Sequence, residues 1–300
     1  MRRKFFTLDV FTRRRYAGNP LAVVLDAGGL DGAAMQSIAR EFNLSETVFV
    51  LPPADAAHRA KLRIFTPKFE LAFAGHPTVG SAVLLNRIDG AKGKRTIVLE
   101  EGVGPVRCAV EAVDAETGSA RFDLARLPAE TGPVGPPAAI AAALNLNEVD
   151  IGLESFKPGR WSAGNEFNFA PLTGLDAMRR CRANTAVWND AFPDQGGRAS
   201  AFLFCRETVE RGHAFHARMF APLAGIIEDP ATGSAVAAFA GVLAHFARPA
   251  DGTHDFVIEQ GYEMGRQSLI HLAMTMKGGK LTAAAIAGEA VVVSEGTLEA

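Results

Sequence analysis

The sequence has few cysteines and almost no excess charge of either sign. Its 300 residues include three cysteines and no C-x-x-C pair, so neither a disulfide framework nor a zinc knuckle is predicted. We expect the cysteines to pack as small apolar residues. Lys and Arg number 31 against 33 Asp and Glu, which gives a net charge of −2 and no basic face for nucleic acid. These absences favour a small-molecule ligand.

Long apolar runs and the common cofactor loops are also missing. No run approaches the roughly 18 apolar residues of a transmembrane helix, and the N-terminus lacks the apolar region of a signal peptide. We therefore expect a cytoplasmic protein without a membrane partner. There is no G-x-G-x-x-G, Walker loop or G-x-S-x-G motif, and no carboxylate completes a metal site with His213 and His216. No cofactor and no metal are expected.

One short unit occurs twice. Residues 74–82 read AGHPTVGSA and residues 228–236 read EDPATGSAV, so P-x-x-G-S-A follows His76 in one copy and Asp229 in the other. Further pairs occur in the same order along the chain: A-G-N at 17–19 and 163–165, G-L-D at 29–31 and 174–176, R-x-F-x-P at 63–67 and 218–222, and E-x-G at 100–102 and 259–261. An ordered series with similar spacings indicates two copies of one supersecondary plan.

This repeat predicts two lobes. The first is expected at 1–118, with the C-terminal strand at 282–300 as a candidate to complete it, and the second at 119–281. Short β-branched or aromatic segments bounded by Gly, Pro or Asn predict strands. These segments are 5–10, 21–25, 47–51, 61–65, 96–99, 121–124, 167–170, 201–205 and 256–259. Residues 31–42 predict an amphipathic helix that Asp31 caps.

The segments that begin at Pro77 and Pro230 carry almost no charge on any face, which predicts two buried helices. We therefore expect an α+β fold of two pseudo-symmetric lobes, in which each sheet wraps around its own central helix. Proline is favoured at the first helical position, and this would place His76 and Asp229 at the two N-caps. Two such helix starts facing each other would form a carboxylate site. The alternative is that Asp229 only caps its helix, as Asp often does.

The repeat is broken at a carboxylate. S-E-T at 45–47 aligns with S-A-F at 200–202, so Glu46 corresponds to Ala201 in the other lobe. A single carboxylate in a twofold scaffold favours one-base chemistry, in which the same group removes a proton and returns it elsewhere on the substrate. The alternative is a surface glutamate at a turn between a helix and a strand.

The motifs D-V-F-T, G-N-P-L-A-V, N-L-S-E-T-V-F-V, A-G-H-P-T-V-G-S-A and E-D-P-A-T-G-S-A together resemble the PhzF-like family of phenazine-biosynthesis isomerases. The resemblance implies a diaminopimelate-epimerase-like fold with its active site in the cleft between the lobes, and a homodimer that needs no metal or organic cofactor. It implies that Glu46 is the acid/base group. It further implies catalytic roles for His76 and Asp229, and substrate-binding roles for Ser45, Gly75 and Ser234.

Three functions are open at this point. The first is a cofactor-independent isomerase that moves a proton within a small cyclic or unsaturated carboxylic acid, as the characterised family member does with a dihydro-hydroxyanthranilate. The second is a two-base amino-acid racemase or epimerase. Relatives of that kind use one thiol from each lobe, and Cys108, Cys181 and Cys205 lie at neither predicted helix start. The third is a non-catalytic protein of the same fold that binds a small ligand.

Overall fold

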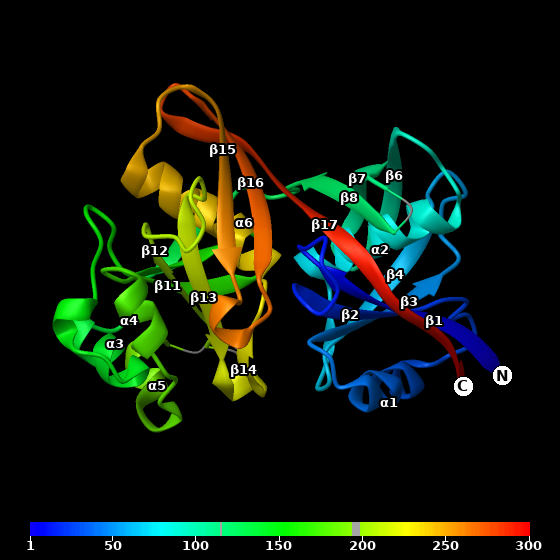
Figure 1. Ribbon diagram of the computed structural model, residues 1–300, viewed down its shortest axis with the longest axis horizontal. Helices are drawn as coiled ribbons and strands as arrows, with labels where there is room; N and C mark the ends of the chain where they lie inside the picture. The colour runs from blue at the N-terminus through cyan, green and yellow to red at the C-terminus, as the bar shows by residue number, and fades with distance from the viewer. Residues whose placement is uncertain (115, 194–198) are drawn as a thin grey trace. The chain divides into compact units, whose positions relative to one another are not determined.

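The computed structural model describes residues 1–114, 116–193 and 199–300. The chain forms two compact units, which are Met1–Asp123 with Ala287–Ala300 (unit 1) and Leu124–Ile286 (unit 2) (Figure 1). The division falls after residue 123 rather than 118, because β8 (Thr117–Asp123) pairs along its length with β7 (Gly104–Ala112) of unit 1. Among the described residues, no helix is long and apolar enough to cross a membrane.

Unit 1 is a closed series of strands around one helix. The series runs β1 (Arg2–Val10), β2 (Asn19–Val24), β3 (Glu46–Leu51), β4 (Ala60–Phe65), β6 (Lys94–Glu101), β7, β8 and β17 (Lys280–Glu299), which pairs back with β1. Helix α2 (Gly75–Ile88) lies inside the series and is buried from its first residue to Asn86. Figure 1 shows α2 enclosed by these strands, with α1 (Gly32–Phe42) outside them against β3 and β4. The short strand β5 (Glu70–Leu71) pairs with β4 and leads toward α2.

Unit 2 repeats this plan. Its strands are β9 (Ala129–Gly132), β10 (Gly159–Ser162), β11 (Glu166–Pro171), β12 (Ala201–Cys205), β13 (Phe215–Ala221), β14 (Ile226–Asp229), β15 (Gly252–Gln260) and β16 (Ser268–Lys277). The pairs β10–β11, β11–β12, β12–β13, β13–β15 and β15–β16 alternate between antiparallel and parallel. The pairs β1–β2, β2–β3, β3–β4, β4–β6 and β6–β7 of unit 1 show the same alternation.

The central helix of unit 2 is α6 (Gly233–Val242), which is buried at every position except Ser234 and continues as a π-helical turn over Leu243–Ala247. The helices α3 (Pro137–Leu144), α4 (Leu175–Arg180) and α5 (Trp188–Ala191) form a separate apolar core with β11 and β12. Short 3-10 turns occupy Glu148–Asp150, Thr185–Val187, Pro222–Ala224 and Tyr262–Met264. The predicted α+β fold with two buried central helices is therefore confirmed.

A bidentate arginine–glutamate ion pair precedes each of the two central helices, at matching places in the two units. Arg63 donates two hydrogen bonds of 2.7 Å to Glu70, and Arg218 donates two of 2.8 Å to Glu228. Both arginines come from the R-x-F-x-P motif, and both glutamates lie on the short strands, β5 and β14, that lead to α2 and α6. Bidentate ion pairs are directional, so each one fixes the path of the chain into its helix.

A second matched contact lies at the ends of β6 and β15. Glu100 and Glu259 each accept hydrogen bonds from two consecutive backbone N–H groups and contact a histidine ring nitrogen. The partners are Ala54, Asp55 and His58 for Glu100, and Val209, Glu210 and His213 for Glu259. Each partner in unit 2 lies 155 positions after its counterpart, which is also the spacing of Arg63 and Arg218. The internal repeat predicted from the sequence is thus confirmed at the level of side-chain contacts.

Most predicted elements occur where the sequence placed them, including α1, whose N-cap Asp31 accepts a hydrogen bond from the backbone N–H of Ala34. The two central helices do not begin where predicted. Helix α2 begins at Gly75, so Pro77 lies within its first turn. Proline is tolerated there because the first N–H groups of any helix lack a partner within it, and a proline loses no hydrogen bond. Helix α6 begins at Gly233, because Thr232 has non-helical backbone angles (φ −117°, ψ 80°), and the backbone N–H of Thr232 donates to the side chain of Gln260.

The three cysteines, Cys108, Cys181 and Cys205, are free and buried, as expected of small apolar residues. Burial raises the pKa of the Cys181 thiol to about 11 and that of the Cys205 thiol to about 12, and it raises the pKa of Cys108 further. A thiol must ionise to act as a base or a nucleophile. None of the three is therefore suited to that role at neutral pH.

Candidate active site

Glu46 is the first residue of β3 and Ala201 is the first residue of β12, so the two residues occupy matching places in the two units. This confirms the alignment that singled out Glu46. The strand β3 runs parallel to β2, with Glu46 opposite Leu21, and the Glu46 side chain keeps 14% of its surface exposed. A partly accessible carboxylate therefore stands at the head of a strand whose following residues are apolar and buried.

His76 faces this carboxylate from α2. Its Nε2 lies 3.4 Å from Oε2 of Glu46, and its side chain is 5% exposed. Within the part of the chain that the structure describes, His76 Nε2 is buried and makes no hydrogen bond. A buried polar atom without a hydrogen bond is costly to a fold, and a catalytic role or a bound partner is one reason why a protein retains such an atom.

The charge state of His76 follows from its burial, which lowers the pKa of the imidazole to about 3. The distance to Glu46 would suit an ion pair, but the cost of burying an imidazolium prevails, and His76 is neutral near pH 7. A neutral imidazole has one N–H donor and one acceptor nitrogen. His76 can therefore donate a hydrogen bond to a substrate, or accept one, without carrying a charge of its own.

Gly75 is the first residue of α2 and is buried, and Ser45 directly precedes Glu46 and is half-buried. The N-cap position of α2 is Ala74, whose side chain forms no capping hydrogen bond. The prediction that His76 occupies this N-cap is therefore wrong, because the helix starts two residues earlier than predicted. A helix start without a capping side chain leaves N–H donors and a partial positive charge available to a substrate carboxylate.

Asp229 is not an N-cap either, because it is the last residue of β14, where it pairs with Met219. Its carboxylate Oδ2 accepts a hydrogen bond of 2.6 Å from the Thr232 hydroxyl. The amide nitrogen of Gln260 donates to the Asp229 carbonyl at 2.7 Å and to Thr232 Oγ1 at 3.1 Å. Asp229 is 6% exposed and is held by a buried polar network.

The predicted site residues divide between the two units. Ser45, Glu46, Gly75 and His76 belong to unit 1, and the structure brings Glu46 and His76 together. Asp229 and Ser234 belong to unit 2, where Ser234 is the second residue of α6 and is half-buried. Both groups are located where a strand end or a loop meets the start of a central helix.

Sequence reasoning missed two buried side chains that support these helix starts. Glu101 contacts Thr78 in α2, and Gln260 contacts Thr232 just before α6. Both are the middle residue of the repeated E-x-G motif, which was noticed for its spacing and not for its chemistry. The alignment of a glutamate with a glutamine in the two copies of this motif was the signal that could have identified them.

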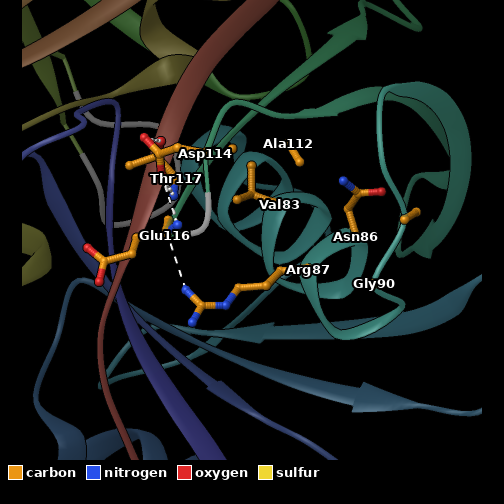
Figure 2. Close-up of a pocket in the computed structure, with 10 residues that line it drawn as sticks. Val83, Asn86, Arg87, Gly90, Ala112, Asp114, Glu116 and Thr117 are labelled. Carbon is orange, nitrogen blue, oxygen red and sulfur yellow. Dashed lines mark hydrogen bonds between the residues drawn. The ribbon is translucent and has the colours of Figure 1, made fainter.

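A pocket of about 170 Å³ lies at the other end of α2 (Figure 2). It is lined by Val83, Asn86, Arg87, Gly90, Ala91, Ala112, Asp114, Glu116, Thr117 and Gly118. Figure 2 shows Arg87 directed at the backbone of Glu116, and the Asp114 carboxylate accepts hydrogen bonds from the N–H groups of Glu116 and Thr117. Its polar groups therefore serve the local turn, and none of the predicted site residues lines it.

A family model described as phenazine biosynthesis-like protein matches residues 8–296. An uncharacterized isomerase from Mesorhizobium japonicum is 51% identical to the chain, covering 99% of it and 98% of the relative. The trans-2,3-dihydro-3-hydroxyanthranilate isomerase of Pseudomonas aeruginosa is 34% identical, covering 98% of both chains.

Solved protein structures are also similar to this chain. The Bacillus anthracis phenazine biosynthesis protein of the PhzF family superposes with a TM-score of 0.89 at 28% identity, covering 100% of both chains. A hydroxyproline epimerase from Agrobacterium vitis superposes with a TM-score of 0.63 at 12% identity, covering 99% of this chain and 92% of the epimerase. The second likeness shows a shared fold of the epimerase type.

Proposed function

Because the chain belongs to the phenazine biosynthesis-like protein family and is an isomerase of that family, we propose that it moves a proton within a small cyclic or unsaturated carboxylic acid. The relative at 34% identity is named for such an acid, a dihydro-hydroxyanthranilate. We propose that the reaction needs neither a metal nor an organic cofactor. The described residues contain no group of three or more His, Cys, Asp or Glu side chains that could hold a metal ion.

The observation that carries the proposal is the placement of His76 Nε2, buried and without a hydrogen bond within the described residues, 3.4 Å from the Glu46 carboxylate. Glu46 takes a proton from a carbon of the substrate, and the electron pair left behind moves along the unsaturated system. Glu46 then returns the proton to a different carbon, so the substrate is isomerised with no net change in atoms. Neutral His76 supports the developing charge through a hydrogen bond.

The substrate carboxylate is proposed to use the start of α2, where Gly75 and Ser45 lie beside His76 and Glu46 in the chain. Asp229 and Ser234 are proposed as further residues of the same reaction. In support, Asp229 is buried and held in one orientation by Thr232 and Gln260, which is the kind of positioning a catalytic group requires.

Proton exchange in deuterated water tests the proposal. The protein is incubated with a panel of cyclic and unsaturated carboxylic acids, including trans-2,3-dihydro-3-hydroxyanthranilate, and the products are followed by NMR. We expect one class of acid to give an isomer that carries deuterium at the newly protonated carbon. The Glu46→Gln variant, folded as judged by circular dichroism, should give none.

Two other outcomes would overturn the proposal. Deuterium entering the α-carbon of an amino acid from both faces would indicate a two-base racemase. Tight binding of a carboxylic acid without any exchange would indicate a ligand-binding protein.

A further inference from the structure

Glu101 is a buried carboxyl group with an unusual set of contacts. It ends β6 and is 8% exposed. Its Oε1 lies 2.7 Å from Thr78 Oγ1, and its Oε2 is buried and has no hydrogen-bond partner within the described residues. No Lys, Arg or His of that part of the chain forms an ion pair with it. Within the described residues, the Thr78 hydroxyl group is the one hydrogen-bond partner of the Glu101 carboxyl group.

The hydroxyl group of Thr78 already has a second neighbour. Its Oγ1 lies 2.8 Å from the carbonyl oxygen of Ala74, at the start of α2. A hydroxyl has a single proton, so it can donate to the carbonyl or to an ionised Glu101 but not to both. A protonated Glu101 allows both contacts, because it donates to Thr78 while Thr78 donates to Ala74. The geometry is that of a relay from β6 to the first turn of α2.

The second unit contains a comparable relay built from an amide, although its threonine, Thr232, aligns with Val79 rather than with Thr78. Gln260 is the residue of the E-Q-G motif that matches Glu101 in E-E-G. Its amide nitrogen donates to Thr232 Oγ1 at 3.1 Å, and the Thr232 hydroxyl donates to Asp229 Oδ2 at 2.6 Å. An amide carries donor protons at every pH and has no charge. Unit 2 therefore has a permanently neutral donor at the position that Glu101 occupies in unit 1.

We propose that Glu101 works as a neutral carboxylic acid that positions the first turn of α2, and with it His76, and that its ionisation in alkaline solution releases this turn. Glu101 is thus a positioning residue rather than a catalytic one. Its effect on turnover rests on the proposed function of Glu46 and His76, whereas its protonation state does not.

The groups that face Glu101 support this assignment. Burial raises the pKa of Glu101 to about 8, although the hydrogen bond from Thr78 opposes the rise. From β7 it faces the Cys108 thiol, whose own pKa is raised by burial and by Glu101, so the thiol stays neutral. From α2 it faces Thr78. On β4, the charged neighbour Lys61 pairs in register with Glu100 and is exposed. An ionised Glu101 would therefore be an uncompensated buried charge.

The variant Glu101→Gln copies the residue that the second unit uses and tests the proposal through thermal unfolding. In the unfolded chain a glutamate ionises near pH 4.5, while folded Glu101 stays neutral up to about pH 8. Between these values the unfolded state releases a proton that the folded state keeps, so the stability of the wild type falls as pH rises and levels off above the folded value. We expect the Tm of the wild type to fall relative to Glu101→Gln by roughly 2–4 °C per pH unit in this window.

Two controls accompany this measurement. Glu111→Gln changes a glutamate on β7 whose side chain is 41% exposed, and its Tm should follow the wild type at every pH. The infrared spectrum of the wild type near pH 6 should contain the band of a protonated carboxylic acid, and this band should vanish near pH 10. Parallel Tm curves for wild type and Glu101→Gln, or no such band near pH 6, would overturn the proposal. Neither measurement depends on finding a substrate.

With a substrate in hand, the pH dependence of kcat/KM tests the link to His76. Wild-type activity should decline above about pH 8, following the ionisation of Glu101. Glu101→Gln should retain activity within about threefold at neutral pH, because its amide can still donate to Thr78 and keep His76 in place for acid/base catalysis by Glu46. It should also lose the alkaline decline, because an amide does not ionise. Glu101→Leu cannot donate to Thr78 and should be impaired at every pH. A folded but inactive Glu101→Gln, or one with the same alkaline decline as the wild type, would show that Glu101 does not position His76 in this way.

Discussion

His76 Nε2 lies 3.4 Å from Oε2 of Glu46, although one residue belongs to the central helix of unit 1 and the other to a strand of the sheet around it. The helix is almost entirely buried, and its first turn also contacts Glu101 of β6 through Thr78. The pair is therefore held by the packing of α2 and by this contact, and not by a hydrogen bond between the two side chains. A rigid arrangement of this kind is suited to proton transfer, which depends closely on distance.

Glu46→Gln should abolish turnover while leaving folding and substrate binding nearly intact. The amide has the size of the carboxyl group but cannot accept and release a proton at neutral pH. General acid/base groups contribute about 10²- to 10⁴-fold in rate, and a sole base should lie at the upper end. Steady-state kinetics and equilibrium binding measure the two effects separately. Glu41→Gln, on the exposed surface of α1, is the matched control and should behave as the wild type. Retention of more than about a tenth of the activity would exclude Glu46 as the base.

His76→Gln should remove an acid sensitivity of the fold. Burial lowers the pKa of His76 to about 3, while an unfolded histidine titrates near 6.5. As pH falls from 6.5 to 3, the unfolded state gains a proton that the folded state cannot take, so the wild type loses up to about 1.4 kcal/mol of stability per pH unit. Urea unfolding at a series of pH values measures this slope. An equally steep slope in His76→Gln would mean that another group causes the acid sensitivity.

Asp229→Asn should fold like the wild type but lower kcat/KM by about tenfold or more, as expected when a charged group that acts on substrate is neutralised. The amide oxygen can still accept the hydrogen bond from Thr232, so the buried network survives. Thr232→Val removes the hydroxyl group that both Asp229 and Gln260 contact, and it should cost about 1–3 kcal/mol of stability. If Asp229→Asn lost stability and not activity, the role of Asp229 would be structural.

Gly80→Ala should destabilise unit 1, because α2 approaches the sheet closely at this position. A methyl group on Gly80 would lie 2.6 Å from Leu21 Cδ2 and 2.7 Å from Val10 Cγ2. Overpacking a rigid core in this way costs about 1–3 kcal/mol. Gly28→Ala is the control, since no atom lies within 4 Å of its added methyl group, and it should change stability by less than about 1 kcal/mol. Chemical denaturation compares the two, and equal effects would contradict the close approach of α2.

The sequence by itself determined the elements and their repetition. Alternating or apolar strand patterns and two uncharged helical segments depend on neighbouring residues, and the structure places them as predicted. The comparison of the two repeats also identified Glu46, because a missing carboxylate at Ala201 can be read from an alignment of the chain with itself.

Only the tertiary structure decided where the central helices begin and which buried groups support them. The start of α6 depends on Gln260, which lies 28 positions beyond Thr232, and the first turn of α2 depends on Glu101, 23 positions beyond Thr78. Local propensity favoured proline as the first helical residue, yet long-range hydrogen bonds and the exclusion of water determined where each helix begins. Burial also decided the charges of His76 and Glu101, because the cost of an ion in the core depends on every segment packed around it.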